Sequence, residues 1–175
     1  LELDKVLLQL SGLASIKDSK EMALELKPAT VLYDAQALIN QTNAAYVLLA
    51  KFGGPSFGAA KNVNSSLSRA AAGGVLTMRE LLDIGEVLRV IRSLYEWRFS
   101  QPGADSCLDV FFSSLCPNRM LENNIFTSIL SEEEMADNAS RELADIRRKM
   151  RNQAQSIREK LEGLVRSTHY QKFLQ

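Results

Sequence analysis

Histidine and cysteine, the side chains that most often hold metal ions or act as nucleophiles and bases, are nearly absent from this sequence. His169 is the only histidine, so a histidine pair for a zinc site or for acid–base catalysis is missing. The two cysteines, Cys107 and Cys116, stand nine residues apart among apolar neighbours, a pattern typical of unbridged, inert core thiols in a reducing compartment. These absences predict a chain with no catalytic site, no bound cofactor and no metal ion.

Long apolar runs and net charge are lacking too. No run is long enough to span a bilayer, and Glu2, Asp4 and Lys5 stand where a signal peptide would be uniformly apolar. The 21 basic and 21 acidic residues cancel, which disfavours a general attraction to polyanions, and a hydrophobic share of 46% argues against disorder. We therefore expect a soluble, cytoplasmic protein without membrane contact. Its 175 residues suffice for one domain or part of one, and the start at Leu1 without methionine favours a part.

Proline and glycine are scarce, and they separate segments in which apolar residues recur every three or four positions. The helices predicted from this spacing cover residues 1–13, 17–26, 31 to about 52, 65–72, 78 to about 99, 105–115 and 118 to about 128. Thr30 is the expected N-cap of the third helix, and Thr77 with Glu80 is expected to form a capping box. The sequence thus predicts an all-α fold, a multi-helix bundle.

Two of these helices carry an apolar face that we expect to be buried. In the third helix the face consists of Leu38, Ala45, Leu48, Leu49 and Phe52. In the helix that begins near residue 78 it consists of Leu81, Ile84, Leu88, Ile91 and Tyr95. Trp97 lies beside that face and is expected to pack between helices.

The segment 52–58, Phe-Gly-Gly-Pro-Ser-Phe-Gly, is the one place where a phosphate-binding loop comes to mind. A Walker A loop needs lysine and then serine or threonine directly after its last glycine, whereas Gly58 is followed by Ala-Ala-Lys. Pro55 also lacks an amide N–H that would bind phosphate. We therefore interpret the segment as a structural turn that Phe52 and Phe57 anchor to the core.

The segment 131–138 is acidic and has no helical period. Glu132, Glu133, Glu134 and Asp137 are candidate cation ligands, but contiguous carboxylates point in different directions and the spacing of a calcium loop is missing. We expect a solvated connector with a few extended residues around Ile129.

A long helix is predicted from Ser140 to at least His169, a stretch without proline and with Gly163 as its only glycine. At 1.5 Å per residue it would be roughly 40 Å or more in length, so we expect it to project from the core. The residues that recur at steps of three and four form a seam, namely Leu143, Ile146, Met150, Ala154, Ile157, Leu161, Leu164 and Thr168. Such a seam needs a partner helix. The predicted domains are therefore a helical core, 1–139, and the start of a long helix, 140–175.

The long helix is basic. From residue 140 to 175 nine basic residues stand against four acidic ones, a net charge of +5. The cluster Arg147, Arg148, Lys149 and Arg151 is our candidate for contacts with nucleic-acid phosphates. The alternative is a solvated helix face stabilised by pairs of Glu142 with Arg147 and of Asp145 with Lys149.

Four motifs in this order resemble a known family. They are Phe-Gly-Gly-Pro-Ser-Phe-Gly at 52–58, Gly-Gly-Val-Leu at 73–76, Asp-Asn-Ala-Ser-Arg-Glu-Leu-Ala-Asp-Ile-Arg-Arg at 137–148 and Tyr-Gln-Lys-Phe-Leu-Gln at 170–175. The sequence resembles the N-terminal region of the second bacterial MutS branch, whose members carry a C-terminal Smr domain. The last two motifs are the most specific.

The resemblance implies the helical core and the start of the lever of a dimeric ATPase, with the long helix leading to a clamp that this chain lacks. It also implies, elsewhere in the full-length protein, an ATPase that binds ATP and magnesium and an Smr nuclease. The targets that it implies are double-stranded or branched DNA, in the suppression of recombination, and the ribosome, in the rescue of collided ribosomes. None of the catalytic motifs of that family lies in this chain.

Our leading hypothesis is a non-catalytic lever module that couples ATPase motion to a clamp on nucleic acid. Leu143, Ile146, Met150 and Ile157 would seat the base of the lever. The alternative is a free-standing helical adaptor whose apolar seam, Leu161 and Leu164 included, binds a partner helix. Both hypotheses predict that the chain itself is not an enzyme.

Overall fold

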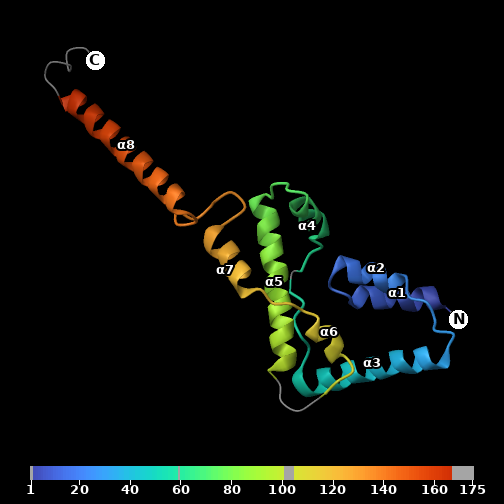
Figure 1. Cartoon of the computed structure of the whole chain (residues 1–175). Coiled ribbons are helices and arrows are strands. Elements are labelled where there is room, and N and C mark those ends of the chain that lie inside the picture. The colour runs from blue at the N-terminus through green and yellow to red at the C-terminus, as the bar shows by residue number, and fades with distance from the viewer. Residues whose placement is uncertain (1, 59, 101–104, 167–175) are drawn as a thin grey trace. The chain divides into compact units, whose positions relative to one another are not determined.

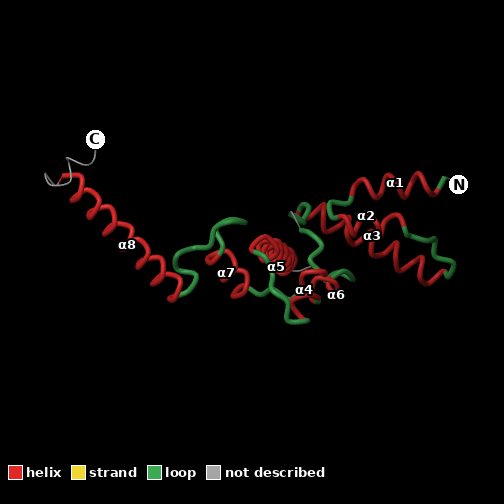
Figure 2. The backbone as a smooth tube through the Cα atoms, turned by 90° about the horizontal axis from the view of Figure 1, so that it is seen from above, coloured by secondary structure: helices red, strands yellow, loops and turns green. Residues whose placement is uncertain are grey.

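The computed structural model describes residues 2–58, 60–100 and 105–166, and in these residues every regular element is a helix (Figure 1). Their bounds are α1 Leu3–Leu13, α2 Lys17–Leu24, α3 Leu32–Phe52, α4 Asn64–Ala71, α5 Met78–Phe99, α6 Asp109–Ser113, α7 Arg119–Ser128 and α8 Arg141–Arg166. Between them the described residues form loops and turns, as the colouring in Figure 2 shows. The prediction of an all-α fold with a long C-terminal helix is confirmed.

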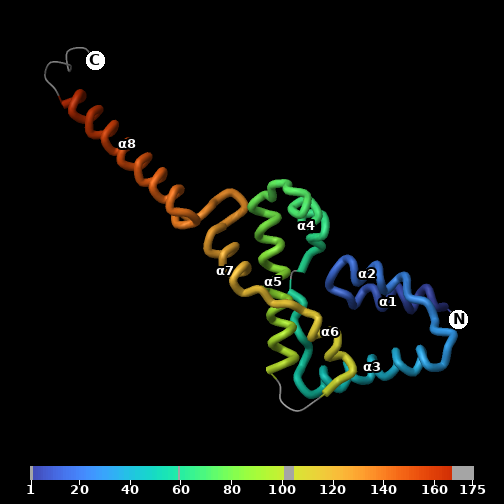
Figure 3. Tube along the Cα trace, viewed as in Figure 1, coloured from blue at the N-terminus to red at the C-terminus, as the bar shows by residue number. Residues whose placement is uncertain are grey.

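The chain forms two compact units, residues 1–126 and residues 127–175. In the first unit α1 and α2 run side by side as a hairpin (Figure 3), and α6 packs against α5. The hairpin is tied to the loop before α4, since Asn62 Nδ2 donates to Asp18 Oδ2 at 2.7 Å. The predicted division at 139/140, which separates core from long helix, stays a prediction.

Helix ends follow local capping chemistry at the predicted capping box and at the end of α4. Thr77 caps α5, with its Oγ1 accepting from the Glu80 N–H at 3.3 Å while Glu80 Oε2 accepts from the Thr77 N–H at 2.8 Å. At the end of α4, Gly73 has a φ of +82°, and the N–H groups of Gly73 and Gly74 donate to the Ala70 and Arg69 carbonyls, both at 2.9 Å. This is a Schellman motif, and its left-handed residue explains why glycine stands there.

The predicted cap of α3 is wrong. Val31 is the N-cap, without a side-chain cap hydrogen bond. Its backbone stays extended, so the helix begins at Leu32 and the Thr30 hydroxyl lies one residue outside the capping position.

α6 is much shorter than the helix predicted over 105–115. Ser106 Oγ accepts from the Leu108 N–H at 3.2 Å, and Asp109 Oδ2 accepts from the Ser106 N–H at 3.0 Å. These short polar side chains hold the backbone in a turn and delay the helix until Asp109.

The core of the first unit is small, and no described side chain is completely buried. Its buried apolar residues are Ala23, Leu48, Ile84, Val90 and Ile125. Of the predicted buried face of α3, Leu48 is buried and Ala45 and Phe52 are half-buried. The prediction is wrong at Leu38 and Leu49, which are 53% and 48% exposed. Near the C-terminal end of α3, Leu48 lines an apolar cavity together with residues of the glycine loop, α5 and α6.

Both cysteines are exposed and free, so their placement in the core is wrong. Cys107 and Cys116 lie in the turns that flank α6 rather than on its packed side. No apolar surface covers them there. Trp97, by contrast, packs between helices as expected, with its ring 5.7 Å from that of Phe112 in α6.

The second unit consists of a folded connector and α8. Ile129 and Met135 form an isolated antiparallel bridge, and the Ala136 N–H donates to the Ser128 carbonyl at 2.8 Å. Ile129 and Ala136 are buried, so the acidic stretch is a closed turn with the extended residues expected around Ile129. The Ser140 hydroxyl then accepts from the Leu143 N–H at 3.1 Å, at the start of α8.

α8 is one uninterrupted helix of 26 residues. At 1.5 Å per residue it is roughly 39 Å long. The predicted continuation to His169 and the motif at 170–175 lie outside the described residues.

Candidate nucleic-acid interface and helix seam

The predicted basic cluster lies on the first turns of α8 and divides into two pairs. Arg147 and Arg151 are four residues apart and so share one face of the helix. Arg148 and Lys149 follow Arg147 directly, and the helical rotation turns them to other sides. The four side chains therefore do not form a single patch.

Arg147 and Arg151 both bind the Asp137 carboxylate. Arg147 Nη1 donates to Asp137 Oδ1 at 2.5 Å, and Arg151 Nη1 donates to Oδ2 at 2.7 Å. Arg147 Nη1 also donates to the Met135 carbonyl at 2.8 Å. Hydrogen bonds from Arg151 and Arg147 hold the pKa of Asp137 below its usual value, because they stabilise the charged carboxylate. We call Asp137, Arg147 and Arg151 the Asp137 clasp.

Arg148 and Lys149 are exposed. Arg148 Nη2 donates to Asp145 Oδ1 at 2.8 Å, a pair one helical turn apart with both side chains more than half exposed. The predicted pairs therefore differ from the observed ones, because Arg147 turns to Asp137 rather than Glu142, and Asp145 binds Arg148 rather than Lys149. Surface pairs of this kind are weak and leave the cations open to other anions.

The predicted seam of α8 is uncovered along the described part of the helix. Leu143 is half-buried, while Ile146, Met150, Ile157, Leu161 and Leu164 are 45% to 66% exposed. Farther along, an open apolar groove is lined by Ala154, Ile157, Leu161 and Val165, with Arg158 and Glu162 at its rim. A helix with such a stripe is stabilised when a second helix covers it.

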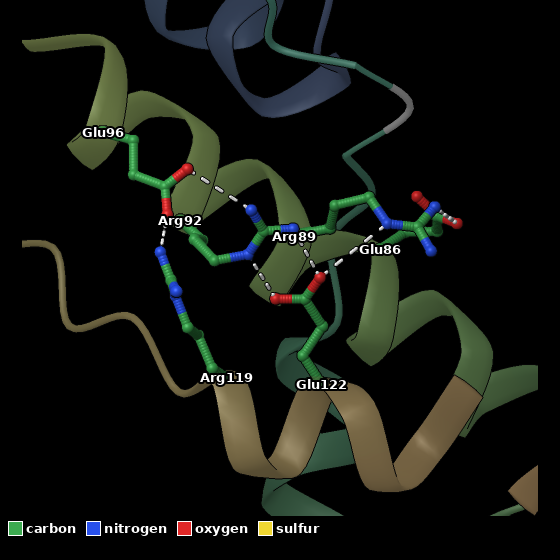
Figure 4. Close-up of polar contacts among 6 residues, drawn as sticks. All are labelled: Glu86, Arg89, Arg92, Glu96, Arg119 and Glu122. Carbon is green, nitrogen blue, oxygen red and sulfur yellow. Dashed lines mark hydrogen bonds and ion pairs between the residues drawn. The ribbon is translucent and has the colours of Figure 1, made fainter. Parts of the chain in front are cut away.

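A charged network links α5 and α7 in the first unit (Figure 4). Arg92 Nε and Nη2 donate to the two Glu122 oxygens, both at 2.8 Å, and Arg92 Nη1 donates to Glu96 Oε2 at 3.4 Å. Arg119 pairs with Glu96, which adds a second link between the helices. Glu122 is only 5% exposed, and the Arg92 hydrogen bonds hold the pKa of its carboxyl below the usual value.

The network continues into apolar packing. The Arg89 guanidinium lies 4.0 Å from the Phe126 ring centroid, in cation–π geometry, and 3.9 Å from Glu122 Oε1. Gly85 allows the close approach of α7, because a Cβ there would lie 2.9 Å from a Phe126 ring carbon. We call Arg89, Arg92, Glu96, Arg119 and Glu122 the α5–α7 joint.

Sequence reasoning missed this joint. Its signal was present, since Arg89, Arg92 and Glu96 are spaced three and four residues apart, which places them on one face of α5. Glu122 was also visible as a carboxylate three residues before Ile125, on the apolar side of α7. The pairing itself spans thirty residues of sequence, which local periodicity does not report.

The glycine loop does not fit a nucleotide phosphate. Gly53 and Gly58 have φ values of 75° and 55°, as expected of a shaped turn, and Lys61 pairs with Asp83 at 2.6 Å. Phe57 lines an apolar cavity of about 200 Å³ together with Leu48, Trp97 and Phe112. The described residues of this loop therefore form a structural turn, with the following lysine engaged by Asp83.

No group of three or more His, Cys, Asp or Glu side chains within residues 2–58, 60–100 and 105–166 is arranged to hold a metal ion. In the same ranges no helix combines the length and the apolar character that crossing a bilayer requires.

This chain is similar to known proteins over its whole length. It is 36% identical over 178 residues to endonuclease MutS2 of Acetivibrio thermocellus and 38% identical over 178 residues to that of Ruminiclostridium cellulolyticum. It is also 36% identical over 169 residues to endonuclease MutS2 of Clostridium perfringens. The first two alignments cover all of this chain and the third covers 95%, yet the chain spans only about 22% of each relative's length. No protein-family model matches the chain.

Proposed function

We propose, from the confirmed relationship of this chain to part of the second bacterial MutS branch, that it is a non-catalytic core and lever module. The full-length protein would be an ATPase and endonuclease that works as a homodimer on double-stranded or branched DNA, on ribosomes, or on both. The relatives' name, endonuclease MutS2, supports nuclease activity in the longer protein. ATP and magnesium would bind outside this chain, because the glycine loop offers no phosphate cradle.

The observation that carries the proposal is α8 itself. It is continuous over 26 residues, none of them buried, and an exposed apolar stripe runs along it. A hydrogen-bonded rod transmits a rotation of its base to its far end, which is what a lever requires. The Asp137 clasp binds its first turns to the folded connector, so movement of the connector would be passed to the helix.

Nucleic-acid contact is assigned to Arg147, Arg148, Lys149 and Arg151. Arg148 and Lys149 are exposed, and one weak surface pair involves Arg148. Binding through such cations is electrostatic and independent of sequence, so it weakens as salt displaces the protein from the phosphates.

The test is binding of the 175-residue chain to a short DNA duplex, followed by fluorescence anisotropy at several salt concentrations. We expect weak binding that is sensitive to salt. The slope of log affinity against log salt concentration falls in magnitude by about 1 for each phosphate contact that is removed. Arg148→Gln/Lys149→Gln should therefore lower both the affinity and the magnitude of this slope. The matched control is Arg158→Gln/Lys160→Gln, which removes equal charge farther along α8. Equal effects of the two double variants would overturn the assignment.

The uncovered groove around Ile157 and Leu161 favours one rival, a helical adaptor that binds a partner helix. The adaptor predicts no measurable DNA binding at any salt concentration. It also predicts that Ile157→Asp, which places a charge in the groove, abolishes the association with a partner helix.

A further inference from the structure

The Asp137 clasp gives one carboxylate to two arginines from successive turns of α8. Each oxygen serves one guanidinium, Oδ1 that of Arg147 and Oδ2 that of Arg151. A backbone phosphate offers the same arrangement, two anionic oxygens on one centre, to a pair of arginines. The carboxylate therefore presents two anionic oxygens to Arg147 and Arg151, as a phosphate would.

The folded connector before α8 fixes the position of the Asp137 carboxylate. The bridge between Ile129 and Met135 and the hydrogen bond from the Ala136 N–H to the Ser128 carbonyl close the turn directly before Asp137. Ile129 and Ala136 are buried under it. Asp137 is thus held beside α8 by folded backbone and not only by its ion pairs.

Solvent and other anions can reach the clasp. The side chains of Arg151 and Asp137 are 64% and 51% exposed, and that of Arg147 is 32% exposed. Ion pairs at such exposure are weak because water screens them, so an anion with more charge competes well. Arg147 keeps a partner if Asp137 leaves, since it also donates to the Met135 carbonyl.

We propose that Asp137 is a built-in phosphate mimic, an autoinhibitory contact that shields Arg147 and Arg151 until a nucleic-acid phosphate displaces it. The proposal rests on the proposed function, because it requires the basic cluster of α8 to contact phosphate. Of the four basic residues of the cluster, Arg148 and Lys149 are exposed and stand outside the clasp in the free chain. When nucleic acid binds closely, Arg147 and Arg151 release Asp137 and contact phosphate as well.

The first experiment compares Asp137→Asn with Glu142→Gln, each of which removes one negative charge near the start of α8. Duplex affinity is measured by fluorescence anisotropy, and circular dichroism checks that α8 is retained. We expect Asp137→Asn to bind the duplex about three- to tenfold more tightly, because binding no longer has to break two exposed ion pairs. Glu142→Gln should change the affinity less than about twofold. Equal changes in the two variants would show a general charge effect and overturn the proposal.

The second experiment adds Arg147→Gln and Arg151→Gln to the Asp137→Asn variant. If the higher duplex affinity of Asp137→Asn comes from the released arginines, these two substitutions cancel the increase. A gain that survives their removal overturns the proposal.

A third measurement needs no variant and is therefore independent of folding defects. The pKa of Asp137 in the unmodified chain is followed by carbon-13 NMR with and without the duplex. Arg151 and Arg147 hold this pKa below its usual value in the free chain, so displacement of the carboxylate raises it. A pKa that stays equally low in the bound chain means that the clasp is intact, which contradicts displacement.

The outcomes separate the two proposals. If Arg148→Gln/Lys149→Gln weakens binding no more than its control, the nucleic-acid interface itself is wrong. If that variant weakens binding but Asp137→Asn behaves like Glu142→Gln, the interface stands and only the shielding by Asp137 fails.

Discussion

Glu122 carries a formal charge in a nearly closed environment, being 5% exposed. Arg92 satisfies both of its oxygens and Arg89 lies 3.9 Å away, so the charge is paired where it is buried. Burial of a charge is tolerated only with such partners, and loss of one partner leaves the other uncompensated. At the residue scale, this carboxylate is the position on which the α5–α7 joint depends.

We therefore expect Glu122→Ala to lower the free energy of unfolding of the first unit by about 3 kcal/mol, because Arg92 loses its main partner in a half-buried site. The measurement is urea denaturation followed by circular dichroism. Glu86→Ala is the matched control: its pair with Arg89 lies one helical turn away on the surface and is worth less than about 1 kcal/mol. Similar losses in the two variants would mean that Glu122 has no special role.

At the scale of single elements, the start of α5 illustrates how one helix end depends on side chains. Glu80 accepts from the Thr77 N–H and hydroxyl, and it also binds Arg69 and Ser66 of α4. The Thr77 backbone hydrogen bond, followed by Arg69, lowers the pKa of Glu80 to about 2. One carboxylate thus caps α5 and holds α4 to it.

This shift predicts a pH dependence. The folded-state pKa is below the unfolded value, so the stabilisation is complete above the unfolded pKa and is lost as pH falls from 4.5 towards about 2. Unfolding measured at neutral pH and through this range should show a steeper acid loss for the native chain than for Glu80→Gln. If stability falls equally with pH in the native chain and in Glu80→Gln, the capping box is not the source of the acid sensitivity.

Thr77→Ala tests the other half of the same box. Removing the hydroxyl that accepts from the Glu80 N–H should cost about 1 kcal/mol at neutral pH, as at other N-caps. Thr42→Ala is a control inside α3, where the hydroxyl only donates to the Leu38 carbonyl of its own helix. The Thr77 variant should be clearly the less stable of the two.

At the scale of the whole molecule, the chain holds two compact units and no nucleotide cradle in its described residues. The contribution that we propose for this chain is mechanical, through α8 and its exposed seam.

The 175-residue chain is accordingly expected to release no phosphate from ATP with magnesium above the buffer background. Malachite-green detection of phosphate is sufficient for this measurement. Lys61→Ala is the informative control, because Lys61 is the basic residue that follows the glycine loop. ATP hydrolysis that persists through repurification and disappears in this variant would refute the proposal of a non-catalytic module.

Local sequence determined the elements of this protein. The bounds of α5, the capping box at Thr77 and Glu80, the glycine end of α4 and the uninterrupted α8 all depend on residues within one or two helical turns of one another. Such interactions act on any chain that carries them, so periodicity and capping rules predict them.

Tertiary structure alone decided which charges are paired and which surfaces are covered. Asp137 lies ten and fourteen residues from its arginines, and Arg92 lies thirty from Glu122, so each pairing depends on how an intervening turn folds back. The exposure of Leu38 and Cys107 likewise follows from which elements do not reach them. A sequence pattern states that a helix has an apolar or a charged face, but the partner of that face is set by contacts between distant segments.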